Sequence, residues 1–99
     1  MKNIAFWSNQ LGERGTEIAM YDYAYYNQTL LNNKSFIFYE INNGNNNLDV
    51  INKFTKQFKV TGVNDFSDVD EYLKKYNIDI IYIIKSGHND GRLSKVAKN

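Results

Sequence analysis

The stretch "NIAFWSNQLGERGTEIAMYDYA", residues 3–24, changes its pattern at two glycines and thereby indicates the fold. Residues 3–8 are a short, β-prone apolar run that ends in polar residues, as expected of a buried strand whose carboxyl end opens into a loop. From Thr16 to about Leu31 the apolar residues fall near one face of a helix. Thr16 can cap this helix, and Glu17 lies in the first turn, where the helix dipole favours an acid. The stretch therefore predicts a strand, a loop and a helix.

The same alternation continues along the chain. Strand-like runs and helical patterns follow in turn at 35–41 (strand), 48–57 (helix), 58–63 (strand), 68–76 (helix, with Asp65 or Ser67 able to cap it) and 78–87 (strand). The order βαβαβαβ with near-continuous apolar strands predicts an α/β fold, a Rossmann-like parallel sheet of about four strands flanked by helices. In the common strand order 3-2-1-4, the loops at 9–16 and 85–92 lie side by side at a topological switch point.

The composition of the chain argues against several classes of function, among them nucleic-acid binding and thiolate metal binding. The chain has 99 residues, enough for one small domain, and its formal net charge of +1 gives no sequence-wide attraction to nucleic acid or anionic lipid. It has no cysteine, which excludes disulfides and thiolate metal sites and suits a reducing, cytoplasmic location. No apolar run approaches the roughly 20 residues of a membrane span. We therefore expect a cytoplasmic domain with no transmembrane segment, no nucleic-acid partner, no metal and no cofactor.

The last predicted strand would lie at an edge of the sheet. Ile80–Ile84 would lie at or near this edge, and an exposed apolar edge predicts pairing with another chain, here a homodimer. Residues 94–99 resemble the start of a further helix, so 1–99 is expected to be part of a longer amino-terminal domain. The run "NNGNNN" at 42–47 is attributed to a biased coding sequence, and no function is drawn from it.

The glycines of the first loop have two interpretations. Glycine there lets the backbone approach a ligand closely, and the following helix amino end offers N–H groups to an anion. Alternatively, Gly12 and Gly15 merely permit a tight turn. No Walker A loop is present, and "FKVTGV" lacks the strand-end aspartate of a phospho-receiver domain. A dinucleotide fingerprint is incomplete, although Glu40, near the end of the second predicted strand, could mimic the ribose-binding acid.

A family resemblance supplies a more specific interpretation. The segment "GTEIAMYDYA", residues 15–24, resembles the segment after the first strand of family 4 type GT-B glycosyltransferases, with Gly15, Glu17, Asp22 and Ala24 in register. Arg14 stands where the first glycine of the family's glycine pair usually lies. The resemblance covers this strand-loop-helix unit and, more loosely, the βα alternation of the whole chain.

The resemblance implies a two-domain enzyme that moves a sugar from a nucleotide-sugar donor to an acceptor, such as a sugar, a lipid or a protein glycan. In such enzymes the acceptor is held mainly by the amino-terminal domain, which residues 1–99 would represent in part. The donor is held mainly by a carboxy-terminal domain absent from this chain, which would carry the family's pair of glutamates. Gly15 maps onto the loop that faces the donor diphosphate. The fragment alone is expected to be inactive.

The candidate substrate-binding residues belong to the two loops at the switch point: Gly12, Arg14, Gly15, Thr16, Lys85, Ser86 and His88. Arg14 has a guanidinium that can bind a phosphate or an acceptor hydroxyl, and His88 is the only histidine of the chain. The alternative for each is a solvated or turn-forming loop residue, since Asn-Asp-Gly at 89–91 is a turn signal without any ligand. A non-catalytic nucleotide- or dinucleotide-binding module stays open as the second reading.

Overall fold

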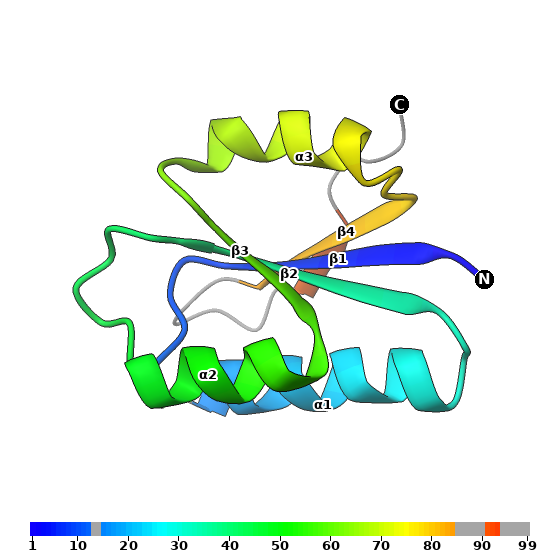
Figure 1. The fold of residues 1–99 in the computed structure, drawn as a ribbon, viewed down its shortest axis with the longest axis horizontal. Helices are drawn as coiled ribbons and strands as arrows, with labels where there is room; N and C mark the ends of the chain where they lie inside the picture. The colour runs from blue at the N-terminus through cyan, green and yellow to red at the C-terminus, as the bar shows by residue number, and fades with distance from the viewer. Residues whose placement is uncertain (13–14, 85–90, 94–99) are drawn as a thin grey trace.

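The computed structural model describes residues 1–12, 15–84 and 91–93, which form a sheet with helices on both of its faces (Figure 1). Its elements, in chain order, are β1 (Asn3–Ser8), α1 (Gly15–Thr29), β2 (Lys34–Glu40), α2 (Leu48–Gln57), β3 (Lys59–Val63), the short 3-10 helix η1 (Phe66–Asp68), α3 (Val69–Lys75), β4 (Ile80–Ile84) and β5 (Gly91–Leu93). The predicted alternation of strands and helices is confirmed.

The first four strands are all parallel, in the order β3-β2-β1-β4. This is the predicted order 3-2-1-4, so the sheet grows in opposite directions from β1. Ser8, the last residue of β1, pairs with Tyr39 of β2 on one side and with Ile84 of β4 on the other. The carboxyl ends of these strands therefore meet at one edge of the sheet.

The fifth strand corrects one expectation. β5 pairs antiparallel with β4, and Tyr82 lies opposite Leu93 in the register. The prediction that Ile80–Ile84 forms an unpaired edge is therefore wrong for Tyr82–Ile84, because the chain returns and satisfies those backbone groups itself. A homodimer stays a prediction, without the free edge on which it relied. Residues 94–99 lie outside the described residues.

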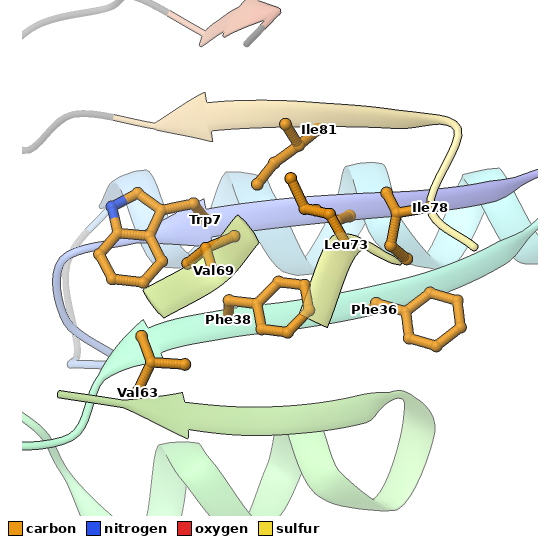
Figure 2. Close-up of a cluster of buried hydrophobic side chains, with 9 residues drawn as sticks. Trp7, Phe36, Phe38, Val63, Val69, Leu73, Ile78 and Ile81 are labelled. Carbon is orange, nitrogen blue, oxygen red and sulfur yellow. The ribbon is translucent and has the colours of Figure 1, made fainter. Parts of the chain in front are cut away.

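Two apolar clusters flank the sheet. Figure 1 shows α3 on one face and α1 with α2 on the other. Figure 2 shows the cluster under α3, which contains Ala5, Trp7, Phe36, Phe38, Val63, Val69, Leu73, Ile78 and Ile81. The opposite cluster contains Ile4, Phe6, Leu11, Met20, Ala24, Ile37, Tyr39, Phe54 and Phe58. Because both faces are covered, both alternating sets of strand residues are buried, which explains the near-continuous apolar runs.

The face of α1 that packs against the sheet is apolar in the middle and carries one polar residue at each end. Glu17, Met20, Ala24 and Asn27 follow one another on this face, and all four are buried. Asn27 donates through Nδ2 to the Ser35 hydroxyl at 2.9 Å, and that hydroxyl donates to the Ala24 carbonyl. Glu17 lies at the opposite end of the helix, where β1 ends. The first turn of α1 therefore carries a buried acid beside the loop that the sequence singled out.

Candidate functional site

The connections that follow the strands gather where β1, β2, β3 and β4 end. Residues 8–12, 40–47 and 63–68 make up this region, called the carboxyl edge below, on the left in Figure 1. Since Ser8 pairs with Ile84, β1 and β4 end at the same edge. The two loops of the predicted switch point therefore start beside each other.

Asn46 joins the β1–α1 loop to the end of β2. Its Oδ1 accepts a hydrogen bond from the Leu11 backbone N–H at 2.9 Å. Its Nδ2 donates to the carbonyls of Glu40 at 2.9 Å and Ile41 at 3.3 Å. The Asn47 N–H then donates to the Leu11 carbonyl at 2.8 Å, so both backbone groups of Leu11 are bound by the asparagine run. The Leu11 side chain is fully buried, and this part of the loop is thus fixed from both sides.

Other asparagines of the run also have defined roles. Asn47 is the N-cap of α2, and its Oδ1 accepts from the N–H groups of Asp49 and Val50. Asn43 accepts from the Asn45 N–H at 2.8 Å. An asparagine side chain carries a donor and an acceptor close to the backbone, and so it replaces missing backbone partners in loops. Asn43, Asn46 and Asn47 therefore have structural roles that the attribution of this run to coding bias does not foresee.

Gly12 is packed against the asparagine run. A Cβ on Gly12 would lie 2.7 Å from the Asn45 carbonyl oxygen, and 3.6 Å from both Gln10 Nε2 and Glu17 Oε2. A contact of 2.7 Å with backbone is closer than a Cβ atom can come, so any other residue at this position would force the two loops apart. The close approach that glycine permits here is thus to the protein's own backbone.

Buried polar side chains support the same loop. Ser8 and Gln10 are both buried, and the Ser8 hydroxyl donates to the Gln10 carbonyl at 2.7 Å. The Gln10 side chain accepts from Asn45 Nδ2 at 3.2 Å. Glu17 is 1% exposed. Among the described residues, no buried side-chain nitrogen or oxygen lacks a hydrogen-bond partner, so this inner layer is internally satisfied.

Of the predicted site residues, the structure describes three. Gly12 lies in the loop, and α1 begins at Gly15, one residue before the predicted cap Thr16. Arg14, Lys85, Ser86 and His88 lie outside the described residues. The asparagines of the run and Gln10 were not selected from the sequence; an amide-rich segment directly after a strand at the switch point is the signal that could have found them.

The exposed surface of the carboxyl edge is rich in amides. Asn9, Asn42, Asn45 and Asn64 are exposed there. Asn9 accepts from the Trp7 indole N–H at 3.0 Å, which ties this rim to the core. The Asn42 and Asn64 side chains approach each other at 3.5 Å. The rim therefore presents neutral donors and acceptors.

The charges of the described carboxyl edge are acidic. Its acids are Glu40, Asp65 and Asp68, and the first turns of the adjoining helices add Glu17, Asp49, Asp70 and Glu71. The hydroxyl of Ser67 donates to the Asp65 carboxylate at 2.7 Å, and this bond lowers the pKa of Asp65 from its ordinary value. Lysines gather instead toward the opposite ends of α2 and α3. Helix dipoles favour this arrangement, with acids in first turns and bases in last turns.

Comparisons with protein families, with curated proteins and with solved structures found no match to this chain. Within the part of the chain that the structure describes, no group of histidine, cysteine or acidic side chains could hold a metal ion. No helix among those residues is long and apolar enough to cross a membrane. The function is therefore inferred from the fold and from the geometry of the carboxyl edge.

Proposed function

We propose that this chain is the amino-terminal, acceptor-side domain of a GT-B glycosyltransferase, in which the carboxyl edge holds a polyhydroxylated acceptor. The observation that supports it most is the amide-rich, internally braced rim at the switch point of a 3-2-1-4 parallel sheet. Ligands of open α/β sheets bind at the carboxyl ends of the strands, where the strand order reverses.

The chemistry of the rim favours an acceptor over a diphosphate. Sugar hydroxyls both donate and accept hydrogen bonds, as do the side-chain amides of Asn9 and Asn45. A diphosphate is bound best by charge-assisted hydrogen bonds from cationic side chains, whereas the described charges of this edge are acidic. Donor binding is then left to a second domain, as the family resemblance implies. Catalysis in such an enzyme rests on positioning and on stabilising the departing diphosphate.

Four residues match the family pattern, and three of them lie at the start of α1 or on its buried face. Gly15 is the first residue of α1, and Glu17 and Ala24 lie on the buried face of that helix. Asp22 is exposed. Gly15 and Glu17 thus belong to the junction of loop and helix, whereas Ala24 packs in the core further along α1.

A non-catalytic dinucleotide-binding module is the second candidate. Glu40 is the last residue of β2, the place where such modules carry the acid that binds a ribose. This candidate predicts binding of NAD by the chain alone, whereas the glycosyltransferase proposal predicts binding of a neutral saccharide.

An NMR titration of the full chain separates the two candidates. We expect amide shifts confined to residues 9–12 and 42–47 with a panel of mono- and disaccharides, and smaller shifts with NAD. Asn9→Ala and Asn45→Ala should weaken saccharide binding, whereas Asn52→Ala, which removes an exposed asparagine from α2, should leave it unchanged. Saccharide shifts spread over other surfaces, or larger shifts with NAD, would reject the acceptor site. Continuation of the reading frame into a second domain with paired glutamates would support the enzyme directly.

A further inference from the structure

The opposite edge of the sheet forms a continuous surface. It comprises residues 1–2, 29–34, 56–59 and 74–79 and is called the amino edge below. In Figure 1, β1 and β2 begin on the right and α1 ends there. The Lys2 N–H donates to Asn33 Oδ1 at 2.9 Å, and the Lys34 N–H donates to the Lys2 carbonyl at 2.8 Å. Asn3 donates to the carbonyls of Tyr76 and Asn77. The segments of this edge are therefore held side by side.

Large apolar side chains protrude from this edge. Met1 is 89% exposed, Leu30 is 74% exposed and Leu31 is 66% exposed. Outside this edge, the described residues exposed to a similar degree are Leu48 at 71%, Tyr23 at 63% and Ile18 at 58%. Tyr26, one turn before Leu30 on α1, is also exposed. Two adjacent exposed leucines, with an exposed tyrosine about one turn before them in the chain, differ from the isolated apolar residues that any protein surface carries.

The same edge carries a ring of lysines. These are Lys2, Lys34, Lys56, Lys59, Lys74 and Lys75, all exposed. The acid of this edge is Asp79, whose carboxylate accepts the Asn3 N–H at 2.8 Å. The near-neutral net charge of the chain therefore hides a strongly basic end.

Three of these lysines are held over aromatic rings. The Nζ atoms of Lys59 and Lys75 lie 5.7 Å and 5.8 Å from the centroid of the Tyr76 ring, and that of Lys34 lies 6.0 Å from the Phe36 ring. A ring face attracts an ammonium group and so restrains a flexible lysine. Strands β2 and β3 and helix α3 each contribute one of them, so the fold itself brings these charges together.

We propose that the amino edge docks onto an anionic lipid bilayer. Leu30 and Leu31 enter the boundary between headgroups and acyl chains, Tyr26 lies at headgroup level, and the lysines face lipid phosphates. Apolar residues that enter the interface, surrounded by lysines that attract anionic lipid, are the combination by which proteins bind membrane surfaces without crossing them. This proposal does not depend on the function proposed for the carboxyl edge.

A nucleic acid fits this surface less well. Single-stranded nucleic acids stack successive bases on open aromatic faces, but the rings beneath the lysines, Phe36 and Tyr76, stack on each other at 5.3 Å, and Phe36 is buried. Tyr26 is then the exposed ring of this patch. Phosphate binding would also leave the protruding leucines without a role. A bilayer accounts for both the lysines and the leucines.

Sedimentation with vesicles of equimolar phosphatidylglycerol and phosphatidylcholine tests the proposal with the full chain. We expect binding to these vesicles and little binding to pure phosphatidylcholine. The variant Leu30→Ser/Leu31→Ser should lower the partition coefficient about tenfold or more, because apolar area is lost from the interface. Lys59→Gln and Lys75→Gln should each lower it about fivefold.

Matched controls come from the same chain. Leu48→Ser removes an equally exposed leucine at the carboxyl edge, and Lys53→Gln removes a lysine from the middle of α2. Both controls should keep the partition coefficient within about twofold of wild type. Equal loss in the Leu48→Ser variant, or unchanged binding of the Leu30→Ser/Leu31→Ser variant, would overturn the proposal.

A measurement on the unmodified chain removes any dependence on how the variants fold. With nitroxide-labelled lipid in anionic nanodiscs, amide signals of residues 29–34 should broaden more than those of 42–47. Stronger broadening at 42–47, or none at either edge, would show that the amino edge does not contact the bilayer. A single-stranded oligonucleotide serves as the competitor. If it released the chain from vesicles, and if the Leu30→Ser/Leu31→Ser variant bound it as tightly as wild type does, the surface would be a nucleic-acid site instead.

Discussion

The two edges of the sheet are held by the same kind of side chain but differ in what they present. Next to the amino edge, Asn3 and Asn27 bond to neighbouring elements, and the edge itself carries lysines and exposed leucines. At the carboxyl edge, Asn46 bonds two loops together, and the surroundings are amides and acids. Among the described residues, one end of the fold thus presents amides and acids, and the other presents lysines and exposed leucines.

The parallel topology explains part of this difference. All three α-helices return antiparallel to the strands, so their first turns lie at the carboxyl edge and their last turns at the amino edge. In α2 and α3, acids occupy the first turn and lysines the last turn, as the helix dipole prefers. Local charge preferences of single helices therefore add up to a separation of charge between the two edges, within the part of the chain that the structure describes.

The largest expected effect concerns Asn46. Asn46→Ala leaves the Leu11 N–H and the carbonyls of Glu40 and Ile41 without this partner, and should cost about 2 to 3 kcal/mol of unfolding free energy. Asn3→Ala frees the carbonyls of Tyr76 and Asn77 and should cost about 1 kcal/mol, because the bond to Asn77 is exposed and that to Tyr76 is only part-buried. Urea unfolding measures both.

Asn42→Ala is the matched control for Asn46, since Asn42 is exposed and makes one long contact with Asn64. It should change stability by less than about 0.5 kcal/mol. If Asn46→Ala were as mild as Asn42→Ala, the carboxyl edge would not depend on the asparagine bridge, and the contrast between the edges would fail.

A smaller effect is expected from Gly12→Ala. Its Cβ would lie 2.7 Å from the Asn45 carbonyl oxygen, so the two loops must separate, which should cost about 1 to 2 kcal/mol. Gly44→Ala is the control within the same edge, because nothing lies within 4 Å of an added Cβ there. Thermal unfolding should show a lower midpoint for Gly12→Ala alone. Similar midpoints for the two variants would mean that the loop contact is loose.

Much of this architecture is predictable from the sequence. Apolar periodicity and breakers place every strand and helix of the parallel unit, because strands covered on both faces need continuous apolar runs such as Phe36–Tyr39. The common strand order then places the two loops at one edge. β5 was missed, because three residues after a turn signal carry no periodicity to detect.

The carboxyl edge was harder to predict than the strands. The position of Gly12 was identified, but the reason for the glycine lies in Asn45, more than thirty residues away in sequence. The role of Asn46 likewise depends on Leu11, a contact that only the folded chain creates. Single-sequence patterns report local preferences, and a side chain that bridges two loops has no local period.

The smallest expected effect tests the charge of the carboxyl edge at Asp65. Because the Ser67 hydroxyl bonds its carboxylate, the pKa of Asp65 is lowered in the folded protein. The resulting stabilisation is present above the pKa of the unfolded chain and is lost as the pH falls through the folded pKa. Ser67→Ala should raise the pKa of Asp65 toward its ordinary value and reduce this acid-dependent part of the stability. An NMR titration of the Asp65 carboxyl carbon measures the change, with Thr55→Ala, an exposed hydroxyl on α2, as control. If Asp65 titrated identically in Ser67→Ala and in wild type, the hydroxyl would not be what lowers its pKa. The backbone N–H groups around Asp65 would then account for the lowered pKa.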